Sequence, residues 1–458
     1  MRRVPAPLAA LMTTALLLAV TWAAFTPAFQ APDEQSHFAY TQFFAETGDL
    51  PGDPGKPIYS SEHIHAAQAA GSDYVMAQPF MRPEWSERRL RVWQDGHARE
   101  PRDDGGGPHS AAGYPPASYA WEAIGYRLAG GDFFDRLTAA RIFSALWLPV
   151  TVLGAWLLAG ELFGRRRELQ VAAAAVPALL PMFAFVSGSV SPDGMMYALW
   201  SLVLWLGVKA LRTGLTPARA FVLVALVGAA CLTKATSYAL LAPAALVLGV
   251  GLWRSSRRLP VAGAAVAAIA VWVALAALVG RAVGGDIVVS ATGTRPGVRG
   301  FGSYLWDFYV PRSLDDYPPF DTFLVGSWAA FGWLEVRFDR GLYLLAAAAV
   351  LLVLGGAGFA LWRTRSRVDP WTAAFVALAV LALLGGLHWT DYRLSLSEQP
   401  FMQGRYLLPV GALMGAAAAG ALTLVPAVRR STALTAGLAF LFAVHVASIG
   451  LLLDRFYA

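Results

Sequence analysis

Eleven apolar segments recur along this chain of 458 residues, and they limit what it can fold into. They cover residues 8–25, 137–163, 169–187, 195–211, 218–232, 237–253, 261–283, 342–362, 371–389, 406–425 and 431–453. A helix needs about 20 apolar residues to cross a bilayer squarely, so several segments are short. The chain is 57% hydrophobic and only 14% charged. Together these features predict an all-α integral membrane protein with about 11 transmembrane helices.

The basic residues alternate between the loops that join these segments. Six clusters occur, at residues 2–3, 165–167, 209–219, 254–258, 363–367 and 429–430. Because cytoplasmic loops are enriched in Lys and Arg, we expect all six inside, with the N-terminus inside and the C-terminus outside. The net charge of +6 therefore reflects membrane topology, and we expect no nucleic-acid partner.

The first apolar segment has two explanations. A basic start, an apolar core and small residues near Ala28 are typical of a cleaved signal peptide. We favour a retained helix, because an acidic motif follows at once and would need that tether. The single cysteine, Cys231, excludes an intrachain disulfide. No P-loop, dinucleotide fingerprint, zinc spacing or nucleophile elbow is present, which disfavours nucleotide-driven transport.

One long polar region lies at residues 26–136 and holds 16 of the 30 acidic residues. We expect it to be the first extracytoplasmic loop of a single membrane domain covering 1–458. Within it, residues 87–93 predict a short interfacial helix and 117–126 an amphipathic helix with aromatic residues. Ordinary interfacial anchoring explains those aromatic residues most simply. A second large outer loop is expected at 282–341.

The most distinctive polar stretch follows the first apolar segment directly, at residues 32–40 (PDEQSHFAY). If Pro32 is the first helical residue, Asp33 and Glu34 lie in the first turn, and His37 falls on the same face. Acidic residues in a first turn suit the helix dipole, so a structural role is one explanation. A catalytic base at a membrane surface is the other.

Short motifs follow one another in order over almost the whole chain. They are Pro32-Asp33-Glu34 with His37-Phe38-Ala39-Tyr40, Tyr114-Pro115-Pro116, Ser187-Gly188-Ser189-Val190 with Asp193, Lys234, Ser327-Trp328 with Phe331-Gly332-Trp333, and Gln403-Gly404-Arg405-Tyr406-Leu407-Leu408-Pro409. This series resembles the bacterial membrane family known as domain of unknown function 2142, and its first and last members are the most specific. The second motif of the family usually reads His-Pro-Pro, and Tyr114 replaces the histidine here.

That family is similar to the C-type glycosyltransferase (GT-C) superfamily. The resemblance implies a GT-C-like bundle of membrane helices with a large first extracytoplasmic loop. It also implies a polyprenyl-phosphate sugar donor and an acidic residue in that loop that acts near the acceptor. Carried onto the matching motifs, it implies substrate binding by His37, Tyr114, Asp193, Lys234, Gln403, Arg405 and Tyr406.

Glycosyl transfer from a lipid phosphate needs a group that removes the proton from the acceptor hydroxyl. A positioned carboxylate typically contributes ~10²–10⁴-fold, and Asp33 is our choice, with Glu34 second. Adjacent helical residues point about 100° apart, so we expect only one of the two to serve the hydroxyl. For His37, a structural partnership with a carboxylate and a contact with substrate both stay open.

The leaving phosphate needs cations, and two basic residues are candidates. Lys234 interrupts apolar sequence, where a lysine costs roughly 2.5–3.5 kcal/mol unless it faces water or an anion. Arg405 begins the penultimate segment and could bind phosphate through two parallel hydrogen bonds. We expect both in one site; the alternatives are snorkelling for Lys234 and interfacial anchoring for Arg405. Asp193 either assists the acceptor site or caps a loop.

These observations predict a glycosyltransferase of the bacterial inner or plasma membrane, with its active site facing outside. It would move a sugar, with inversion, from a polyprenyl-phosphate donor to a cell-envelope glycan or protein. The alternatives are a transporter or flippase for a lipid-linked glycan, which needs an alternating path more than an acid, and a non-catalytic envelope assembly protein. No cofactor is required. A divalent metal could bind Asp33, Glu34 and Asp193, but no ligand spacing demands one.

Overall fold

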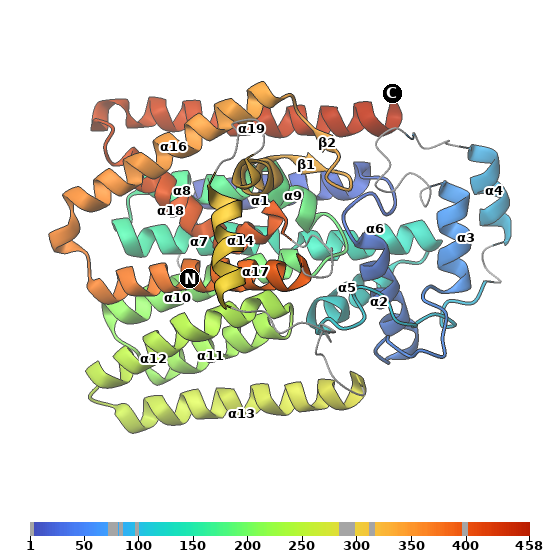
Figure 1. Cartoon of the computed structure of the whole chain (residues 1–458), viewed down its shortest axis with the longest axis horizontal. Coiled ribbons are helices and arrows are strands. Elements are labelled where there is room, and N and C mark those ends of the chain that lie inside the picture. Colours follow the sequence, from blue (N-terminus) through green and yellow to red (C-terminus); the bar gives the residue numbers. More distant parts are fainter. Residues whose placement is uncertain are drawn as a thin grey trace.

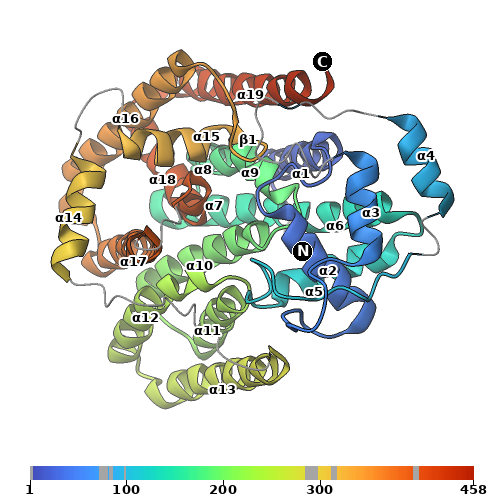
Figure 2. The same ribbon diagram turned by 45° about the vertical axis from the view of Figure 1, so that its right-hand side comes forward.

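The computed structural model describes residues 4–71, 81, 86–96, 100–283, 298–310, 317–395 and 402–458. Long helices lie side by side and form most of the molecule, with the short helices α2–α5 gathered at one end (Figure 1). A second view shows α13 at the edge of this bundle, beside α11 and α12 (Figure 2). Within the described residues the only sheet is a small antiparallel hairpin of β1 (Ala330–Phe331) and β2 (Val336–Arg337).

The structure has these elements besides the hairpin. The bundle contains α1 (Ala6–Phe25), α6 (Phe133–Ala145), α7 (Leu148–Phe163), α8 (Arg167–Leu179), α9 (Pro181–Ser187), α10 (Asp193–Thr213), α11 (Pro217–Cys231), α12 (Leu241–Arg254), α13 (Arg258–Val283), α16 (Arg340–Arg363), α17 (Pro370–Ser395), α18 (Gly411–Leu422) and α19 (Ala427–Tyr457). The more polar regions contain α2 (Glu34–Thr47), α3 (Ser61–Ala70), α4 (Glu87–Gly96), α5 (Ala117–Leu128), α14 (Val298–Tyr309) and α15 (Gly326–Trp328). Short 3₁₀ or π-helical turns are η2 (Ala235–Leu240), η3 (Phe320–Val325), η4 (Arg365–Arg367) and η5 (Gly404–Val410).

Each of the eleven apolar segments of the sequence falls on helix. Among the described residues, nine helices are long and apolar enough to cross a membrane. The count rises to ten if α8 and α9, which are bent by 53° at the break between them, together form one span rather than a re-entrant loop. The remaining segment is α11, whose 15 residues span only about 22 Å of a bilayer core of ~30 Å. The predicted all-α, polytopic fold is therefore confirmed, while the eleventh crossing stays a prediction.

The bend between α8 and α9 has a local cause. A proline disfavours the helical conformation of the residue before it, and Leu180, which precedes Pro181, is extended at φ −68° and ψ 121°. Pro177 removes a backbone donor from the last turn of α8. The chain then passes through residues 187–193, which are all buried. The bend therefore sends a polar turn into the protein at the start of α10.

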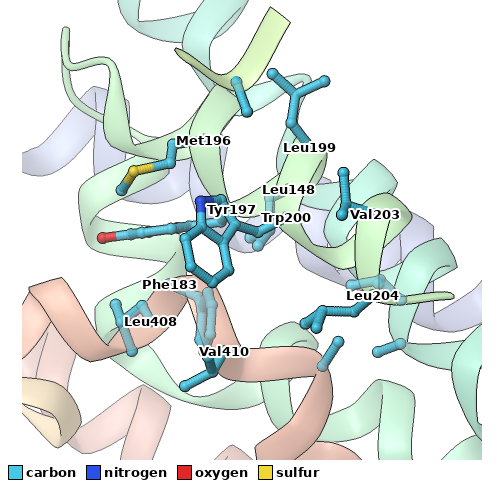
Figure 3. Packing of buried hydrophobic residues seen from close by; sticks show 14 of the residues in the cluster. Leu148, Phe183, Met196, Tyr197, Leu199, Trp200, Val203, Leu204, Leu408 and Val410 are labelled. Carbon is cyan, nitrogen blue, oxygen red and sulfur yellow. The ribbon is translucent and has the colours of Figure 1, made fainter. Parts of the chain in front are cut away.

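The main core lies where α10 packs against its neighbours, and Figure 3 shows these side chains from close by. Trp200 of α10 meets Leu148 of α7, Phe183 of α9 and Val410 of η5 in one buried cluster. Trp200 is fully buried, and its indole N–H donates to Ser237 Oγ at 3.2 Å. A buried indole needs such a partner. This packing fixes α10 against the segment that carries residues 404–410.

The polar region predicted at 26–136 is helical and has a small core of its own. Phe38 of α2 lies edge-to-face with Phe133 at 5.1 Å, and His63 of α3 stacks on Phe29 at 4.8 Å. The helices predicted at 87–93 and 117–126 are confirmed as α4 and α5. The helix α6 begins at Phe133, within the region predicted at 26–136, and the bounds of that region as an extracytoplasmic loop stay a prediction. Of the second outer loop predicted at 282–341, residues 284–297 and 311–316 lie outside the described residues.

The two ends of the bundle differ in charge. At one end the basic loops pair with acids, with Arg254 to Asp369 at 3.5 Å and Arg430 to Glu168 at 3.7 Å. At the other end α1 and α19 finish together, where the Tyr457 hydroxyl donates to the carbonyl of Phe25 at 3.0 Å. The helices α2–α5 lie at this second end (Figure 1). Which end faces the cytoplasm stays a prediction from the basic loops.

Candidate active site

A sharp turn between α1 and α2 positions the first acidic residue. Asp33 adopts the left-handed conformation, at φ 63° and ψ 3°, and precedes α2, which begins at Glu34. The expectation that Pro32 is the first helical residue was therefore wrong. A left-handed residue other than glycine costs about 1–2 kcal/mol, although Asp tolerates it better than most. Such strain is found preferentially at functional sites.

The carboxylate of Asp33 does not cap α2, although its position is that of an N-cap. It accepts a hydrogen bond from Arg405 Nη2 at 2.6 Å, across 372 positions of sequence. Arg405 Nη1 donates to the Pro32 carbonyl at 3.3 Å, so one guanidinium holds both the turn and its acid. The turn is also held by Trp333 of the β1–β2 hairpin, whose indole N–H donates to the Phe29 carbonyl at 2.9 Å.

Four charged side chains meet beside this turn, and we call them the charge cluster: Asp33, Arg405, Asp193 and Lys234. Lys234 Nζ lies 2.6 Å from Asp193 Oδ1, and Arg405 Nε lies 3.9 Å from Asp193 Oδ2. Asp193 thus bridges the two cations that the sequence predicts in one site. Three members are buried, whereas the side chain of Asp33 is 38% exposed. The cluster therefore has two acidic and two basic side chains, and one of the two acids, Asp33, is open to solvent.

The charges in this cluster stabilise one another. Burial alone would raise the pKa of Asp33, but the positive charges of Arg405 and Lys234 and the hydrogen bond from Arg405 outweigh it and hold that pKa below its usual 3.8. Burial alone would lower the pKa of Lys234, but Asp193, Tyr114 and Tyr406 together outweigh it and raise that pKa above 10.5. Both residues are therefore ionised at neutral pH.

Two polar atoms inside the cluster have no hydrogen-bond partner among the described residues. They are Arg405 Nε and Asp193 Oδ2, both buried and too far apart to bond each other at 3.9 Å. The buried Oε1 of Gln403 also lacks a partner. Buried polar groups are usually satisfied, so these atoms are candidates for contact with a bound ligand.

Two tyrosines predicted to bind substrate lie against the cations. Lys234 Nζ is 4.9 Å from the ring centre of Tyr406 and 5.8 Å from that of Tyr114. The guanidinium of Arg405 is 5.4 Å from the Tyr406 ring. Aromatic faces attract cations at these distances. The hydroxyl of Tyr197, buried in the main core, donates to the Arg405 carbonyl at 3.0 Å and fixes its backbone.

His37 lies behind the cluster rather than in it. Its Nδ1 is 2.8 Å from the hydroxyl of Tyr119, and the two rings stack at 5.8 Å. Burial lowers the pKa of His37 to about 3, more than the negative charge of Asp33 raises it, so the imidazole is neutral. Of the two roles left open for His37, this geometry favours the structural one.

Glu34 does not have the surroundings of a base. Its carboxylate is fully buried and receives Arg141 Nε at 2.7 Å and Arg141 Nη2 at 2.5 Å. The backbone N–H groups of Phe29 and Val190 also donate to it, each at 3.1 Å. Four donors occupy the capacity of a carboxylate, so no lone pair is left for an acceptor hydroxyl. This geometry favours a structural role for Glu34, which holds the turn in place, and its catalytic role stays a prediction.

Two supporting residues, Arg141 and Glu122, were not predicted. Glu122 of α5 accepts from Thr41 Oγ1 and from the N–H of Ser191, both at 3.1 Å. Ser191 Oγ in turn accepts from the N–H of Asp193 at 3.2 Å. Burial raises the pKa of Glu122 to about 8, so its carboxyl is largely protonated at neutral pH. No motif marks either residue, because their role depends on spatial neighbours alone.

The positions of the acidic side chains bear on whether a divalent metal could bind Asp33, Glu34 and Asp193. Among the described residues, no group of three or more His, Cys, Asp or Glu side chains is arranged to hold a metal ion. The carboxylate of Asp33 is instead paired with Arg405, and that of Asp193 is paired with Lys234. The cluster thus presents cations to a ligand.

A helical bundle with charged residues at one end defines this protein as a polytopic membrane protein with a GT-C-like fold. Apo ArnT from Cupriavidus metallidurans superposes with a TM-score of 0.52 at 16% identity, over 91% of this chain and 60% of that one. AglB from Archaeoglobus fulgidus, an oligosaccharyltransferase in complex with an inhibitory peptide and a dolichol-phosphate, gives 0.50 at 12%, over 98% and 56%. An oligosaccharyltransferase from Archaeoglobus fulgidus in the apo form gives 0.50 at 13%, over 97% and 56%. The chain thus spans 60% or less of these proteins, and at such identities the likeness shows the fold alone.

Residues 16–414 match the family described as "Predicted membrane protein (DUF2142)", and the chain belongs to that family. The resemblance inferred from the motifs is therefore confirmed. No curated protein matches the sequence.

Proposed function

We propose that this protein transfers a sugar from a polyprenyl-phosphate donor to a hydroxyl-bearing acceptor of the cell envelope, a glycan or a protein. The observation that carries the proposal is the charge cluster: two buried cations that share one buried acid, next to a second acid that solvent reaches. Cations suit the phosphate of the donor, and an exposed carboxylate suits proton transfer. A structure of AglB, which has a similar fold, holds a dolichol-phosphate, and this supports a lipid phosphate as ligand.

Lys234 and Arg405 would bind the phosphate. A polyprenyl-phosphate sugar carries one negative charge on its phosphodiester, and the lipid phosphate that leaves carries two. Cations placed beforehand stabilise the charge that develops in the transition state more than the charge of the ground state. Arg405 Nε, which has no hydrogen-bond partner in the part of the chain that the structure describes, can donate to a phosphate oxygen.

Asp33 would act as the base. The acceptor oxygen forms a bond to the anomeric carbon while the bond from that carbon to the phosphate oxygen breaks. The hydroxyl proton passes to a carboxylate oxygen of Asp33, and the electron pair of the broken bond leaves with the lipid phosphate. Direct displacement of this kind inverts the anomeric centre. The partial exposure of Asp33 is what allows an acceptor to approach it.

Donor binding would also change the surroundings of Asp33. Arg405 is paired with Asp33 in this structure, and a phosphate would compete for the same guanidinium. Because Asp193 is buried and Asp33 is partly exposed, Asp33 is the acid that can move away. Release from Arg405 would raise the pKa of Asp33 and make it a stronger base once the donor is in place.

An apolar cavity between the helices that precede and follow Lys234 in sequence would receive part of the lipid tail. It has a volume of about 180 Å³ and lies between α11, α12 and α13. Its lining residues are Val224, Val227, Gly228, Leu241, Ala244, Ala245, Leu248, Ile269 and Trp272. The lining residues of α11 and α12 lie on the two helices that precede and follow Lys234 along the chain, and this connection is our reason for assigning the cavity to the tail of the donor.

We place the site at the outer face of the bacterial membrane. This assignment rests on the basic loops at the opposite end of the bundle, where Arg254 pairs with Asp369 and Arg430 with Glu168. Loops rich in Lys and Arg are typical of the cytoplasmic side. An envelope glycan or protein would then reach Asp33 from outside.

Reconstitution tests the proposal directly. The purified chain in lipid nanodiscs is mixed with a synthetic polyprenyl-phosphate sugar and envelope material, and released lipid phosphate and glycosylated product are both quantified. We expect equal amounts of the two. Donor that crosses the membrane of proteoliposomes without any cleavage would refute transfer and favour the flippase alternative.

A further inference from the structure

A second cluster of titratable side chains lies outside the charge cluster, where α14 lies across α17 (Figures 1 and 2). The Tyr309 hydroxyl is 2.6 Å from His388 Nε2, and His388 Nδ1 is 3.1 Å from the Tyr304 hydroxyl. The Tyr304 hydroxyl donates to Asp391 Oδ2 at 2.6 Å. Asp391 Oδ1 accepts from the N–H of Met402 at 2.8 Å. We call this series the α14–α17 chain.

The chemistry of the groups gives this chain a direction. A carboxylate can only accept, so Tyr304 must donate to Asp391, and the Tyr304 oxygen must then accept from His388 Nδ1–H. A neutral imidazole has one N–H, so His388 Nε2 accepts the proton of Tyr309. Every donor and acceptor in the series is thereby satisfied, which makes the contact between α14 and α17 specific rather than merely apolar.

The hydrogen-bonded series that we call the α14–α17 chain ends close to the charge cluster. Met402 is three residues before Arg405, and η5 begins in between at Gly404. The Asp391 carboxylate therefore fixes the backbone that leads into the phosphate-binding arginine. His388 and Asp391 are both buried, so the anchor is held away from solvent.

A second route from α14 reaches the same backbone. Phe308 packs on Phe323 of η3 at 5.5 Å, and it also lies 4.9 Å from His388. The backbone on both sides of Phe323 approaches Gly404 so closely that a Cβ on Gly404 would overlap backbone atoms of Thr322 and Gly326. The start of η5 is thus held on one side by α17 and on the other by η3 and α15. The helix α14 contacts both α17 and η3.

We propose that Asp391, together with Tyr304 and His388, positions Arg405 for the phosphate of the donor. The inference rests on the proposed function, since it assigns the donor phosphate to Arg405. These three are positioning residues: none of them touches the phosphate. They act by fixing the path of residues 402–405, so that the guanidinium, held by the Pro32 carbonyl, can exchange its contact with Asp33 for one with the incoming phosphate.

Binding of a short-chain polyprenyl phosphate to the full-length protein in nanodiscs tests this, by isothermal titration calorimetry. Asp391→Ala should raise Kd by about tenfold or more, and Tyr304→Phe by about three- to tenfold. The conservative Asp391→Asn should stay within about threefold, because its amide can donate to Tyr304 while its oxygen still accepts from Met402. The chain then runs in reverse, with Tyr304 donating to His388 and His388 donating to Tyr309.

Thr390→Val is the matched control, because Thr390 is exposed and its hydroxyl bonds only within α17, to the Gly386 carbonyl. It should bind like wild type. Unchanged Kd in Asp391→Ala and Tyr304→Phe, even with lowered thermal stability, would overturn the inference, and so would an Asp391→Asn variant as weak as Asp391→Ala. If wild type itself binds no polyprenyl phosphate, the proposed function fails instead.

Discussion

Replacing Asp33 by Asn separates the chemistry of this residue from its structural role. Asn also tolerates the left-handed conformation that Asp33 adopts, so the turn should keep its shape. The carboxylate makes no capping hydrogen bond that the amide would lose. Its ion pair with Arg405 does disappear, but at 38% exposure of Asp33 this contact is worth under about 1 kcal/mol after screening by solvent. We therefore expect a folded protein with a nearly unchanged unfolding temperature.

Catalysis should respond very differently. Without a carboxylate to take the hydroxyl proton, kcat should fall by ~10²–10⁴-fold, which corresponds to roughly 3–5 kcal/mol on the barrier. Donor affinity should rise, because Arg405 no longer has a competing anion. The signature is therefore a collapse of kcat together with an equal or lower KM for the donor, whereas a variant that damages the site raises KM.

The assay measures release of lipid phosphate from a synthetic donor by wild type, Asp33→Asn and Asp53→Asn. Asp53 makes the control because it carries the same chemical change at an exposed turn, where its carboxylate accepts from Gly55 N–H at 2.8 Å. Turnover by Asp33→Asn within about threefold of wild type would refute the assignment of the base. A raised KM with unchanged kcat would show instead that Asp33 binds substrate.

Three further outcomes follow from the structure. Lys234→Ala should lower the free energy of unfolding by about 3–5 kcal/mol, because it leaves Asp193 buried without its cation, and a single variant as stable as wild type would contradict this. The double variant Lys234→Met, Asp193→Asn should restore the unfolding temperature but not phosphate binding. Burial raises the pKa of Glu122 from 4.5 in the unfolded chain to about 8 in the folded protein, so between pH 4.5 and 8 the folded state binds more protons and its stability should fall as the pH rises. In thermal melts, Glu122→Gln should flatten this decline, and an unchanged slope of stability against pH would contradict the assignment. Ala244→Phe should fill the apolar cavity and weaken binding of polyprenyl phosphate about tenfold without affecting inorganic phosphate, whereas Val222→Phe, on an exposed position of α11, should do neither.

Much of the architecture could be predicted, because apolar segments long enough to be helices leave a direct record in sequence. The short motifs also pointed to Asp33, Asp193, Lys234 and Arg405, whose side chains the structure brings together. What could not be predicted depends on contacts between distant segments. Neighbouring acids in a first turn look alike in sequence, and only the position of Arg141, 107 residues later, distinguishes Glu34 from Asp33.

The left-handed turn illustrates the same limit. The residues around Asp33 suit a helix start at Pro32, and the local rules for such a start are sound. The actual start at Glu34 is imposed by the hairpin indole on Phe29 and by Arg405 on Pro32, both of which come from more than 300 residues away. Local preference was overridden by tertiary contacts, as strained backbone at functional sites requires.

The distance between Asp33 and Arg405 along the chain has a consequence for biosynthesis. Three members of the charge cluster lie within the first 234 residues, and together they carry one net negative charge, whereas the fourth follows 372 positions after the first. Until residue 405 has been inserted, these three residues lack the second cation that the proposed phosphate site needs. Under the proposed function, binding of a lipid phosphate would therefore require synthesis of nearly the whole chain.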